Sequence, residues 1–350
     1  MTTASRKRVL SGMRPSGRLH LGNYVGALEN WVRMQGEYEN YHLVADWHVL
    51  TTDYEHADEI YPNTLEMVKD WLAAGIDPEK SPMFRQSQIK EHAELHLVFS
   101  MLITTARLQR NPTLKDQVRD LEERLRAREL AGEELAENEA TEMSLITYGH
   151  LGYPVLQSAD ILLYKGNAVP VGEDQLPHIE ITREIARRFN RSFGEVFPVP
   201  EGVVLKETKF SRLPGPDGRR MSKSLGNTIY LADSEEETVK AIMGAITDPQ
   251  KVRKNDPGRP EICNVFTYHQ KFNPDEIPQI EADCRSGALG CVACKQNCAA
   301  KLNEHLRPLR ERRAQYNDSG VLKVLQSGEE RARIVAGETM RQVREAMKIG

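Results

Sequence analysis

The sequence predicts an α/β protein, in which a Rossmann-like domain with a parallel sheet precedes a second, mostly α-helical domain. Up to about residue 227, short apolar segments alternate with longer segments of helical periodicity, as in a sheet with crossover helices. From about residue 228, apolar residues recur only at helical spacing. The chain has 350 residues, enough for two domains. We therefore expect a catalytic domain over residues 1–227 and a helical domain over residues 228–350.

The first predicted unit is a strand, a glycine-bearing loop and a helix. Val9 and Leu10 form the strand, residues 14–23 form the loop, and the helical pattern is established from Tyr24. The start of a helix presents unpaired N–H groups and the positive end of its dipole, which attract phosphate. The glycines of the loop would let the backbone approach a ligand closely.

The other predicted elements of the first domain alternate in the same way. Strands are expected at residues 41–48, 83–85 and 168–171, and helices at residues 65–74, 95–108, 153–164 and 179–189. Since ligands bind at the carboxyl ends of such strands, we expect Arg14, His48 and Gln86 to converge on one crevice. In the second domain, helices are expected at residues 235–245, 291–305 and 329–347, and the last of these is a candidate to pack back on the first domain.

Residues 114–140 interrupt this alternation. Arg and Glu alternate around apolar residues at helical spacing, and residues 133–142 are strongly acidic. This pattern predicts an inserted charged helix or a mobile arm, and a solvated helix without a role is the alternative.

Composition excludes some classes of protein. Apolar residues make up 39% and charged residues 28%, as in globular proteins. No run reaches the roughly eighteen apolar residues of a membrane helix, and no signal peptide is evident. We therefore expect a cytoplasmic protein without membrane contact. The net charge of −4 implies that any RNA contact uses local basic stretches, and solvated helix faces are the alternative. The candidate stretches are residues 251–259, 301–313 and 331–348.

Three segments carry a resemblance to a known family. Residues 20–23 (His-Leu-Gly-Asn) resemble the HIGH motif of class I aminoacyl-tRNA synthetases, and residues 220–224 (Arg-Met-Ser-Lys-Ser) resemble their KMSKS loop. The first ends in Asn in place of His and the second begins with Arg in place of Lys, so polarity and charge are kept. Residues 153–175 are similar to tryptophanyl-tRNA synthetases in particular, and the resemblance extends from Val9 to about Met347.

The resemblance implies a tryptophan–tRNA ligase. Such an enzyme joins L-tryptophan to ATP, releases pyrophosphate, and passes tryptophan to the terminal ribose of tRNA(Trp). The resemblance also implies Mg²⁺, held mainly by ATP and water, and a homodimer. Two alternatives remain open. One is another adenylate-forming enzyme, such as a tyrosyl-tRNA synthetase or a small-molecule adenylyltransferase, and the other is a paralogue with a regulatory binding role.

The same resemblance implies residue roles. The catalytic residues are His20, Asn23, Ser222 and Lys223. The ATP contacts are Arg14, Pro15, Ser16, Gly22, Asn23, Gly172, Glu173, Asp174, Phe210, Arg220, Met221, Ser222, Lys223 and Ser224. The tryptophan contacts are Asp160, Tyr153, Gln175 and His48, and an ordinary histidine at a strand end is the alternative for His48. Asp160 lies in an apolar stretch, and in apolar surroundings it would accept the indole N–H, so amino acids without that group would be rejected. The alternative is an Asp on the side of a helix that is bonded to a neighbouring backbone group or Arg.

All five cysteines fall between residues 263 and 298, which favours a metal or cluster over disulfides in a cytoplasmic protein. The spacing of Cys263, Cys284, Cys291 and Cys294 resembles that of family members with a [4Fe-4S] cluster, although the first interval is shorter. Cys298 is an alternative ligand. Four thiolates also suit Zn²⁺, which we rank second, and ordinary buried cysteines are the remaining alternative.

Overall fold

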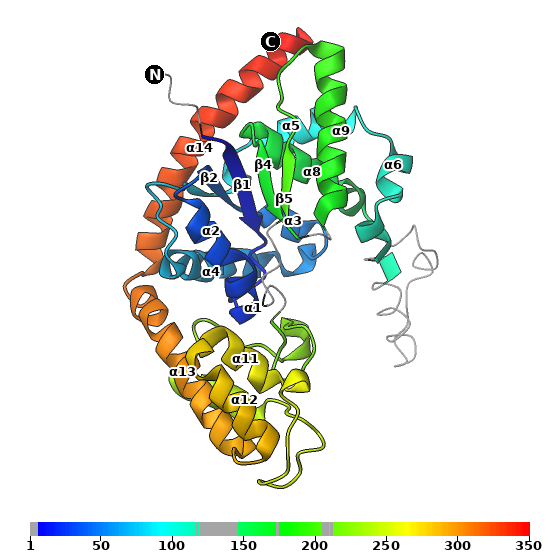
Figure 1. Cartoon of the computed structure of the whole chain (residues 1–350). Helices are drawn as coiled ribbons and strands as arrows, with labels where there is room; N and C mark the ends of the chain where they lie inside the picture. Colours follow the sequence, from blue (N-terminus) through cyan, green and yellow to red (C-terminus); the bar gives the residue numbers. More distant parts are fainter. Residues whose placement is uncertain (1–5, 117, 120–145, 173–174, 205–209, 211–212) are drawn as a thin grey trace, which may run out of the picture.

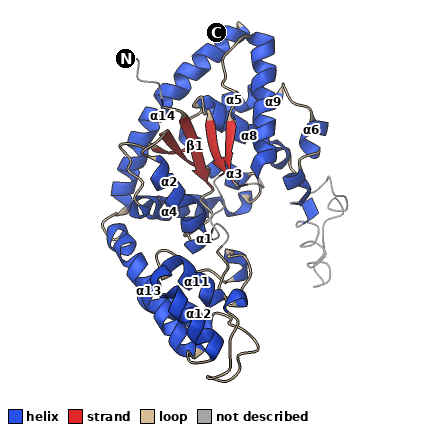
Figure 2. Ribbon diagram, in the orientation of Figure 1, coloured by secondary structure: helices blue, strands red, loops and turns tan. Residues whose placement is uncertain are grey.

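The computed structural model describes residues 6–116, 118–119, 146–172, 175–204, 210 and 213–350. It confirms the α/β class, because a parallel sheet wrapped by helices is followed by a region built of helices (Figures 1 and 2). In the view of Figure 2 the strands lie in the upper half, and α11, α12 and α13 form the lower lobe.

Five parallel strands form the sheet, in the order β3-β2-β1-β4-β5. The strands are β1 (Arg8–Met13), β2 (Glu39–Val44), β3 (Met83–Arg85), β4 (Ala168–Val171) and β5 (Glu201–Val204). The order reverses at β1, since β2 lies on one side of it and β4 on the other. Such a reversal opens a crevice beyond the carboxyl ends of the strands, where ligands bind in this class of sheet.

Helices cover both faces of this sheet. They are α1 (Leu21–Asn23), α2 (Glu29–Met34), α3 (Asp46–Leu50), α4 (Ile60–Ala74), α5 (Glu91–Ser100), α6 (Thr105–Gln109), α8 (Tyr148–Leu163) and α9 (Leu176–Phe193), with a π-helical turn η1 (Tyr24–Leu28) joining α1 to α2. The helices that follow are α10 (Glu235–Gly244), α11 (Asn264–Phe272), α12 (Ile277–Ser286), α13 (Cys291–Arg313) and α14 (Asp318–Met347). Short 3₁₀ turns are η2 (Tyr54–Glu59), η3 (Gln86–Gln88), η6 (Lys223–Leu225), η7 (Pro260–Ile262) and η8 (Pro274–Glu276).

Two elements end earlier than their sequence pattern predicts. The strand expected over residues 41–48 stops at Val44, because the buried carboxylate of Asp46 accepts hydrogen bonds from the backbone N–H groups of Trp47 (2.9 Å) and Ser87 (3.0 Å) and so holds a turn. His48 therefore lies on α3 rather than at a strand end. The helix expected over residues 95–108 is divided into α5 and α6, and the Thr104 side chain caps the start of α6. Strand β5 has no counterpart in the sequence prediction.

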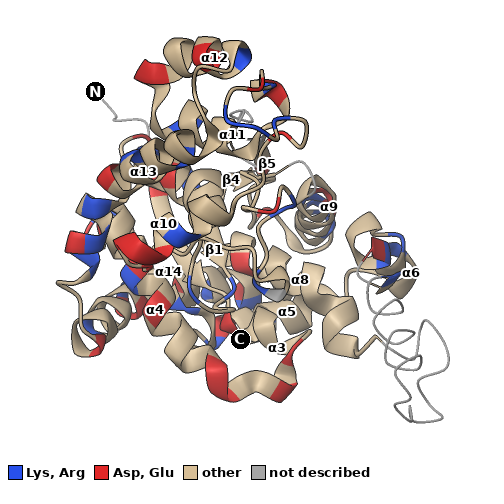
Figure 3. Ribbon diagram, turned by 90° about the horizontal axis from the view of Figure 1, so that it is seen from below, with Lys and Arg blue, Asp and Glu red and all other residues tan. Residues whose placement is uncertain are grey.

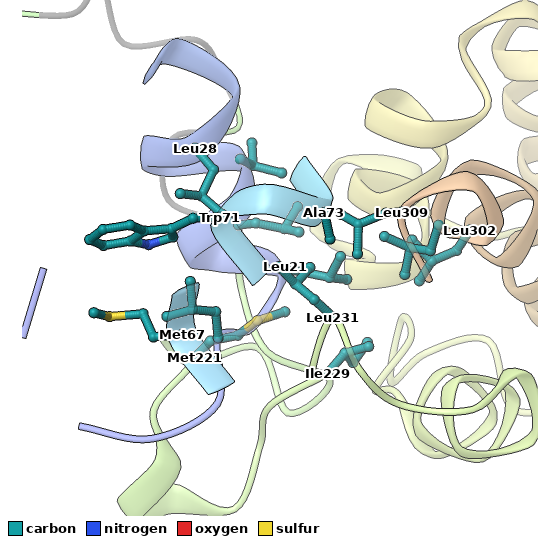
Figure 4. Close-up of a cluster of buried hydrophobic side chains, with 14 of the residues drawn as sticks. Leu21, Leu28, Met67, Trp71, Ala73, Met221, Ile229, Leu231, Leu302 and Leu309 are labelled. Carbon is teal, nitrogen blue, oxygen red and sulfur yellow. The ribbon is translucent and has the colours of Figure 1, made fainter. Parts of the chain in front are cut away.

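One hydrophobic cluster joins the sheet region to the helices that follow it. Figure 4 shows part of this cluster: Leu21 from α1, Trp71 from α4, Leu309 from α13, and Leu231 from the loop that precedes α10. Because this cluster crosses residue 228, the two regions share buried surface at the expected domain boundary.

Helix α14 runs back along the sheet region (Figure 1). It passes so close to β3 that a Cβ on Gly328 would lie 1.9 Å from the carbonyl oxygen of Met83. Beside this contact, Arg85 binds the buried carboxylate of Glu329 through its Nε at 2.7 Å. Farther along α14, Arg344 pairs with Glu94 on α5. These contacts attach the last helix to the sheet region.

The charged segment expected over residues 114–140 falls almost wholly outside the described residues. Within the part of the chain that the structure describes, no helix combines the length and apolar character needed to cross a membrane.

Candidate active site

A cavity of about 440 Å³ opens at the carboxyl ends of β1, β2 and β4. The crevice predicted from the strand order therefore exists. Its lining includes residues far apart in the sequence that were predicted for ATP or tryptophan, namely Arg14, His48, Tyr153, Asp160, Gly172 and Gln175.

Asp160 lies on α8 with its side chain 4% exposed, and it forms part of the cavity wall. Three side chains contact its carboxylate: Gln86 Nε2 at 2.7 Å and His92 Nδ1 at 2.6 Å from Oδ1, and His48 Nε2 at 2.9 Å from Oδ2. The expectation of apolar surroundings is therefore wrong beyond the helix of Asp160 itself. It reflected only the neighbours of Asp160 on α8, whereas the donors come from three other elements.

These donors keep Asp160 ionised. Burial raises the pKa of this carboxyl group, but the hydrogen bonds from His48 and His92 outweigh burial and hold the pKa well below its ordinary value. A buried carboxylate at neutral pH acts only as a hydrogen-bond acceptor. The wall of the cavity thus offers a fixed acceptor to a ligand N–H.

Polar groups on another side of the cavity come from α8, α9 and β1. The Tyr153 hydroxyl lies 2.7 Å from His178 Nε2, and burial raises the pKa of Tyr153 to about 12 although nearby Arg14 lowers it. Arg14 donates from Nη2 to Thr52 Oγ1 at 2.6 Å. Tyr153 is therefore a neutral hydroxyl beside a guanidinium, an arrangement suited to the polar end of an amino acid.

The glycine loop and the segment around residue 223 meet directly. The Lys223 ammonium donates to the carbonyl oxygen of Ser16 at 2.7 Å, and a Cβ on Gly17 would lie 2.9 Å from Lys223 Nζ. Two backbone hydrogen bonds of 2.9 Å extend the contact, from Leu21 N to Ile229 O and from Leu231 N to Leu19 O. Segments about two hundred residues apart in the sequence therefore form one edge of the crevice.

His20 and Asn23 shape the start of α1. Asn23 Oδ1 accepts the backbone N–H of His20 at 3.1 Å, which caps the first turn. A Cβ on Gly22 would lie 3.0 Å from the His20 ring, so glycine gives the ring its room. Burial first, and then the charges of Lys223 and Arg220, lower the pKa of His20 to about 4. His20 is accordingly neutral near pH 7 and can donate a hydrogen bond without carrying charge.

Two residues, Met221 and Asn227, fix the loop around Lys223 to the rest of the protein. Met221 is buried in the cluster of Figure 4, beside the helix that begins at Leu21. Asn227, which was not predicted, accepts the Ser222 backbone N–H through Oδ1 at 2.8 Å and donates from Nδ2 to the Arg220 carbonyl oxygen at 3.0 Å. These contacts fix the backbone of residues 220–222 against the rest of the protein.

Other predicted ATP residues lie outside the cavity lining. Pro15 is buried, Arg220 is exposed, and Phe210 packs against the cluster of Figure 4 with Lys271 Nζ 6.0 Å from its ring centre. Glu173, Asp174 and the side chain of Ser224 lie outside the described residues.

The cysteines gather near α11, α12 and α13 as free thiols. Burial, followed by the proximity of Cys263, Cys284 and Cys291, raises the pKa of Cys294 to about 12. Cys298 packs in the hydrophobic cluster. Among the described residues, no three His, Cys, Asp or Glu side chains are arranged to hold a metal ion. The described residues therefore do not support the predicted iron–sulfur or zinc site, which stays a prediction.

Several residues around the cavity were not singled out from the sequence. His92, His178 and Thr52 contact the predicted residues Asp160, Tyr153 and Arg14 through side-chain hydrogen bonds, and the hydroxyl of Tyr164 contacts His92. Gln86 was expected only to lie near the crevice. The rule that ligands bind at strand ends, which indicated Gln86, could have drawn attention to the next helix, α5. Nothing in the local sequence distinguishes His92 on that helix.

Comparison with known proteins gives one consistent result. A family model described as tRNA synthetases class I (W and Y) matches residues 2–307. The tryptophan–tRNA ligase of Aquifex aeolicus is 45% identical over 396 aligned positions, which cover 98% of this chain and 100% of that protein. The tryptophan–tRNA ligase of Thermotoga maritima is 46% identical over 347 positions, covering 98% and 99%. A crystal structure of tryptophanyl-tRNA synthetase from Campylobacter jejuni, complexed with ADP and tryptophan, matches with a TM-score of 0.83 at 32% identity and covers 97% and 99% of the two chains.

Proposed function

The chain belongs to the class I tRNA synthetases for tryptophan and tyrosine, and from this premise we propose that its crevice activates L-tryptophan with ATP and then charges tRNA(Trp). The buried carboxylate of Asp160 in the cavity wall is the observation that favours tryptophan as the amino acid substrate. An acceptor at this depth suits a ring that carries an N–H, and a ring without one leaves the acceptor unpaired at a cost.

In the first step the tryptophan carboxylate attacks the α-phosphorus of ATP. The carboxylate is already ionised, so the step needs positioning and charge neutralisation rather than a general base. We assign the indole N–H to Asp160 and the ammonium group to Tyr153 and Gln175, which line the same cavity. His48 binds Asp160, so its role is to orient that acceptor from the cavity side.

We assign the triphosphate of ATP to the joined loops, which are residues 14–23 and residues 220–224 where they meet. His20, Asn23 and Ser16 lie on one side of this junction, and Ser222 and Lys223 lie on the other. When ATP binds, Lys223 Nζ would exchange the Ser16 carbonyl oxygen for phosphate oxygens. A charge that moves onto the leaving pyrophosphate stabilises the transition state more than the bound substrate.

Mg²⁺ is general for the family and would neutralise phosphate charge. The described residues offer no cluster of three His, Cys, Asp or Glu side chains for a cation, which suits an ion held by phosphate oxygens and water. The residues that would adjoin it are those of the joined loops, above all Ser16 and Lys223.

In the second step the end of the tRNA must reach this crevice. We propose that the helical region, residues 228–350, binds the tRNA. Figure 3 shows basic and acidic residues mixed over the visible helices. In two candidate basic stretches, many arginines already bind groups of the chain itself, including Arg310, Arg312, Arg313, Arg331, Arg341 and Arg344. The loop with exposed Arg253 and Lys254 is therefore the better candidate for RNA. Charging of tRNA for translation would place the protein in the cytoplasm.

We also propose a homodimer through the outer face of α5 and the start of α8. Leu97, Met101 and Tyr148 are 57%, 69% and 70% exposed there. They adjoin a hollow lined by Trp47 and Leu50, among other residues. An apolar face of this kind suits a symmetric partner.

ATP–pyrophosphate exchange with tryptophan, with tyrosine and without an amino acid tests the activity, and tRNA(Trp) charging forms the second arm. Exchange should depend on tryptophan, and Asp160→Ala should reduce it by about 10⁴-fold or more, because the N–H acceptor is lost. Exchange that is equally fast with tyrosine, or an Asp160→Ala variant that still separates tryptophan from tyrosine, would contradict the assignment.

A further inference from the structure

His92 connects the tryptophan acceptor to the protein interior. It lies in the first turn of α5 and is fully buried. Its Nδ1 is 2.6 Å from Asp160 Oδ1, and its Nε2 is 2.9 Å from the Tyr164 hydroxyl. Tyr164 follows Asp160 by four residues at the end of α8, so both side chains lie on the same face. Tyr164 is itself fully buried and stacks on Tyr41 with ring centres 5.2 Å apart.

The two neighbours of His92 determine which of its nitrogens carries the proton. An ionised carboxylate only accepts hydrogen bonds, so His92 Nδ1 must be the donor to Asp160. Nε2 then offers its lone pair to the Tyr164 hydroxyl, which donates. The ring is held at both ends, and Asp160 is held with it.

The acceptor positions of Asp160 are nearly filled. A carboxylate has about four acceptor positions, two on each oxygen. His92 and Gln86 occupy those of Oδ1, and His48 occupies one position on Oδ2. Among the described residues, no donor takes the remaining position on Oδ2. Since Asp160 lines the cavity, a bound ligand is what can reach it.

We propose that His92 is a positioning residue for tryptophan specificity: supported by Tyr164, it fixes the Asp160 carboxylate so that a single acceptor position faces the substrate. This inference rests on the proposed function and adds a residue that touches neither tryptophan nor ATP. Its consequence is selectivity for a ring with one N–H at one place.

The charged and titratable groups around Asp160 explain why a donor is needed at this position. His48 faces it from α3, His92 and His96 face it from α5, and Tyr164 follows on α8 with Glu91 and Tyr41 beside it. Burial raises the pKa of Asp160, and the histidine donors oppose this effect. Without the His92 donor, the carboxyl group gains a proton more readily as the pH falls. A carboxyl proton facing the cavity would oppose an indole N–H.

Two substitutions of the same residue separate the donor from the shape. In His92→Asn the side-chain amide can place an N–H where Nδ1 stands, whereas His92→Leu fills similar space without a donor. The substrates are tryptophan and its isostere in which sulfur replaces the indole N–H, and the readout is ATP–pyrophosphate exchange.

For His92→Leu, we expect kcat/KM for tryptophan to fall about 10- to 100-fold while the value for the sulfur isostere changes little. The KM for ATP should stay unchanged, and the KM for tryptophan should rise more steeply with falling pH than it does in the unaltered protein. His92→Asn should retain most of the selectivity. Tyr164→Phe removes only a hydroxyl, so it tests the same inference if His92→Leu does not fold. It should lower selectivity about two- to tenfold, because the His92 ring is then held less firmly.

Equal losses for tryptophan and the sulfur isostere in His92→Leu, or in Tyr164→Phe if that variant must replace it, would show a merely structural role and overturn the inference. A flat pH profile in His92→Leu would do the same. Failure of the proposed function looks different, because the unaltered protein would then show no tryptophan-dependent exchange.

Discussion

Gly17 and Gly194 have similar positive φ angles, +114° and +107°, which side chains rarely adopt, but they have different surroundings. A Cβ on Gly17 would lie 2.9 Å from Lys223 Nζ, whereas a Cβ on Gly194 has nothing within 4 Å. The two positions therefore separate the conformational cost of a side chain from its effect on the joined loops.

Gly17→Ala and Gly194→Ala should each lose about 1–2 kcal/mol of unfolding free energy, because alanine is strained at this φ. Only Gly17→Ala should lower kcat of exchange, by about 10- to 100-fold, because its methyl group moves the Lys223 ammonium from Ser16. Urea unfolding and exchange kinetics measure the two effects. If Gly194→Ala lowered kcat equally, the contact of Lys223 with the loop would have no special part in the reaction.

His42 predicts a pH dependence of stability. It is fully buried on β2, stacked on Trp31 with ring centres 4.9 Å apart, and burial lowers its pKa to about 3. The folded protein therefore keeps His42 neutral, whereas the unfolded chain protonates it below about pH 6.5. The unfolded state then binds the additional proton, so stability is lost as the pH falls from about 6.5 towards 3.

Replacement of this ring should remove that dependence. Relative to His42→Phe, the unaltered protein should lose about 1.4 kcal/mol of unfolding free energy for each pH unit below about 6. Urea unfolding at several pH values measures the difference. His56→Gln changes an exposed histidine that pairs with Asp53, and it should leave the slope unaltered. Parallel curves for His42→Phe and the unaltered protein would contradict the assignment.

At the scale of elements, α14 provides the sharpest packing contrast. Gly328 faces the Met83 backbone at a distance that no Cβ can occupy, whereas a Cβ on Gly337 meets nothing within 4 Å. Both glycines lie within the same helix. The requirement for glycine at residue 328 therefore comes from the close crossing of α14 over β3 and not from the helix itself.

Gly328→Ala should lower the unfolding free energy by about 2 kcal/mol or more, because backbone must move to admit the methyl group. Gly337→Ala should raise it by about 0.5–1 kcal/mol, since alanine favours helix over glycine. Thermal or urea unfolding of both variants provides the comparison. A loss at residue 337 equal to that at residue 328 would mean that α14 does not lie on β3 as described.

Element contacts also link the helical region to the glycine-bearing loop that precedes α1. Arg313 of α13 donates from Nε to Asp70 Oδ1 at 2.6 Å, and Asp70 Oδ2 accepts the backbone N–H of Leu19 at 3.1 Å. Asp70 is fully buried on α4. A single carboxylate therefore ties the residue before His20 to the helical region, which limits how far these elements can move independently.

At the scale of the whole molecule, the apolar face on α5 predicts an oligomer. Met101→Glu should convert dimer to monomer in sedimentation velocity, because a charge at an apolar interface costs several kcal/mol without a partner. Ile334→Glu changes an equally exposed aliphatic residue on α14 and should leave the dimer intact. A dimer that withstands Met101→Glu would move the interface elsewhere.

The sequence alone determined the fold class and most strands and helices, and it indicated the segments to which we assign ATP binding. Periodicity and turn residues are local signals, so they indicated the helix around Asp160, the strand at residues 83–85 and the end of α4 at Gly75. Motif order indicated that the loops near residues 20 and 222 act together. The comparisons confirm the family that these motifs indicated.

Only the tertiary structure decided what surrounds each functional group. His48, Gln86 and His92 reach Asp160 from three elements, and no spacing along α8 reveals them. The contact of Lys223 with Ser16 spans 207 positions of chain. Burial and hydrogen bonding depend on neighbours in space, and these set the charge of Asp160 and His20. A sequence pattern can indicate that a carboxylate lies on an apolar helix, but packing determines whether it is lone or held by donors.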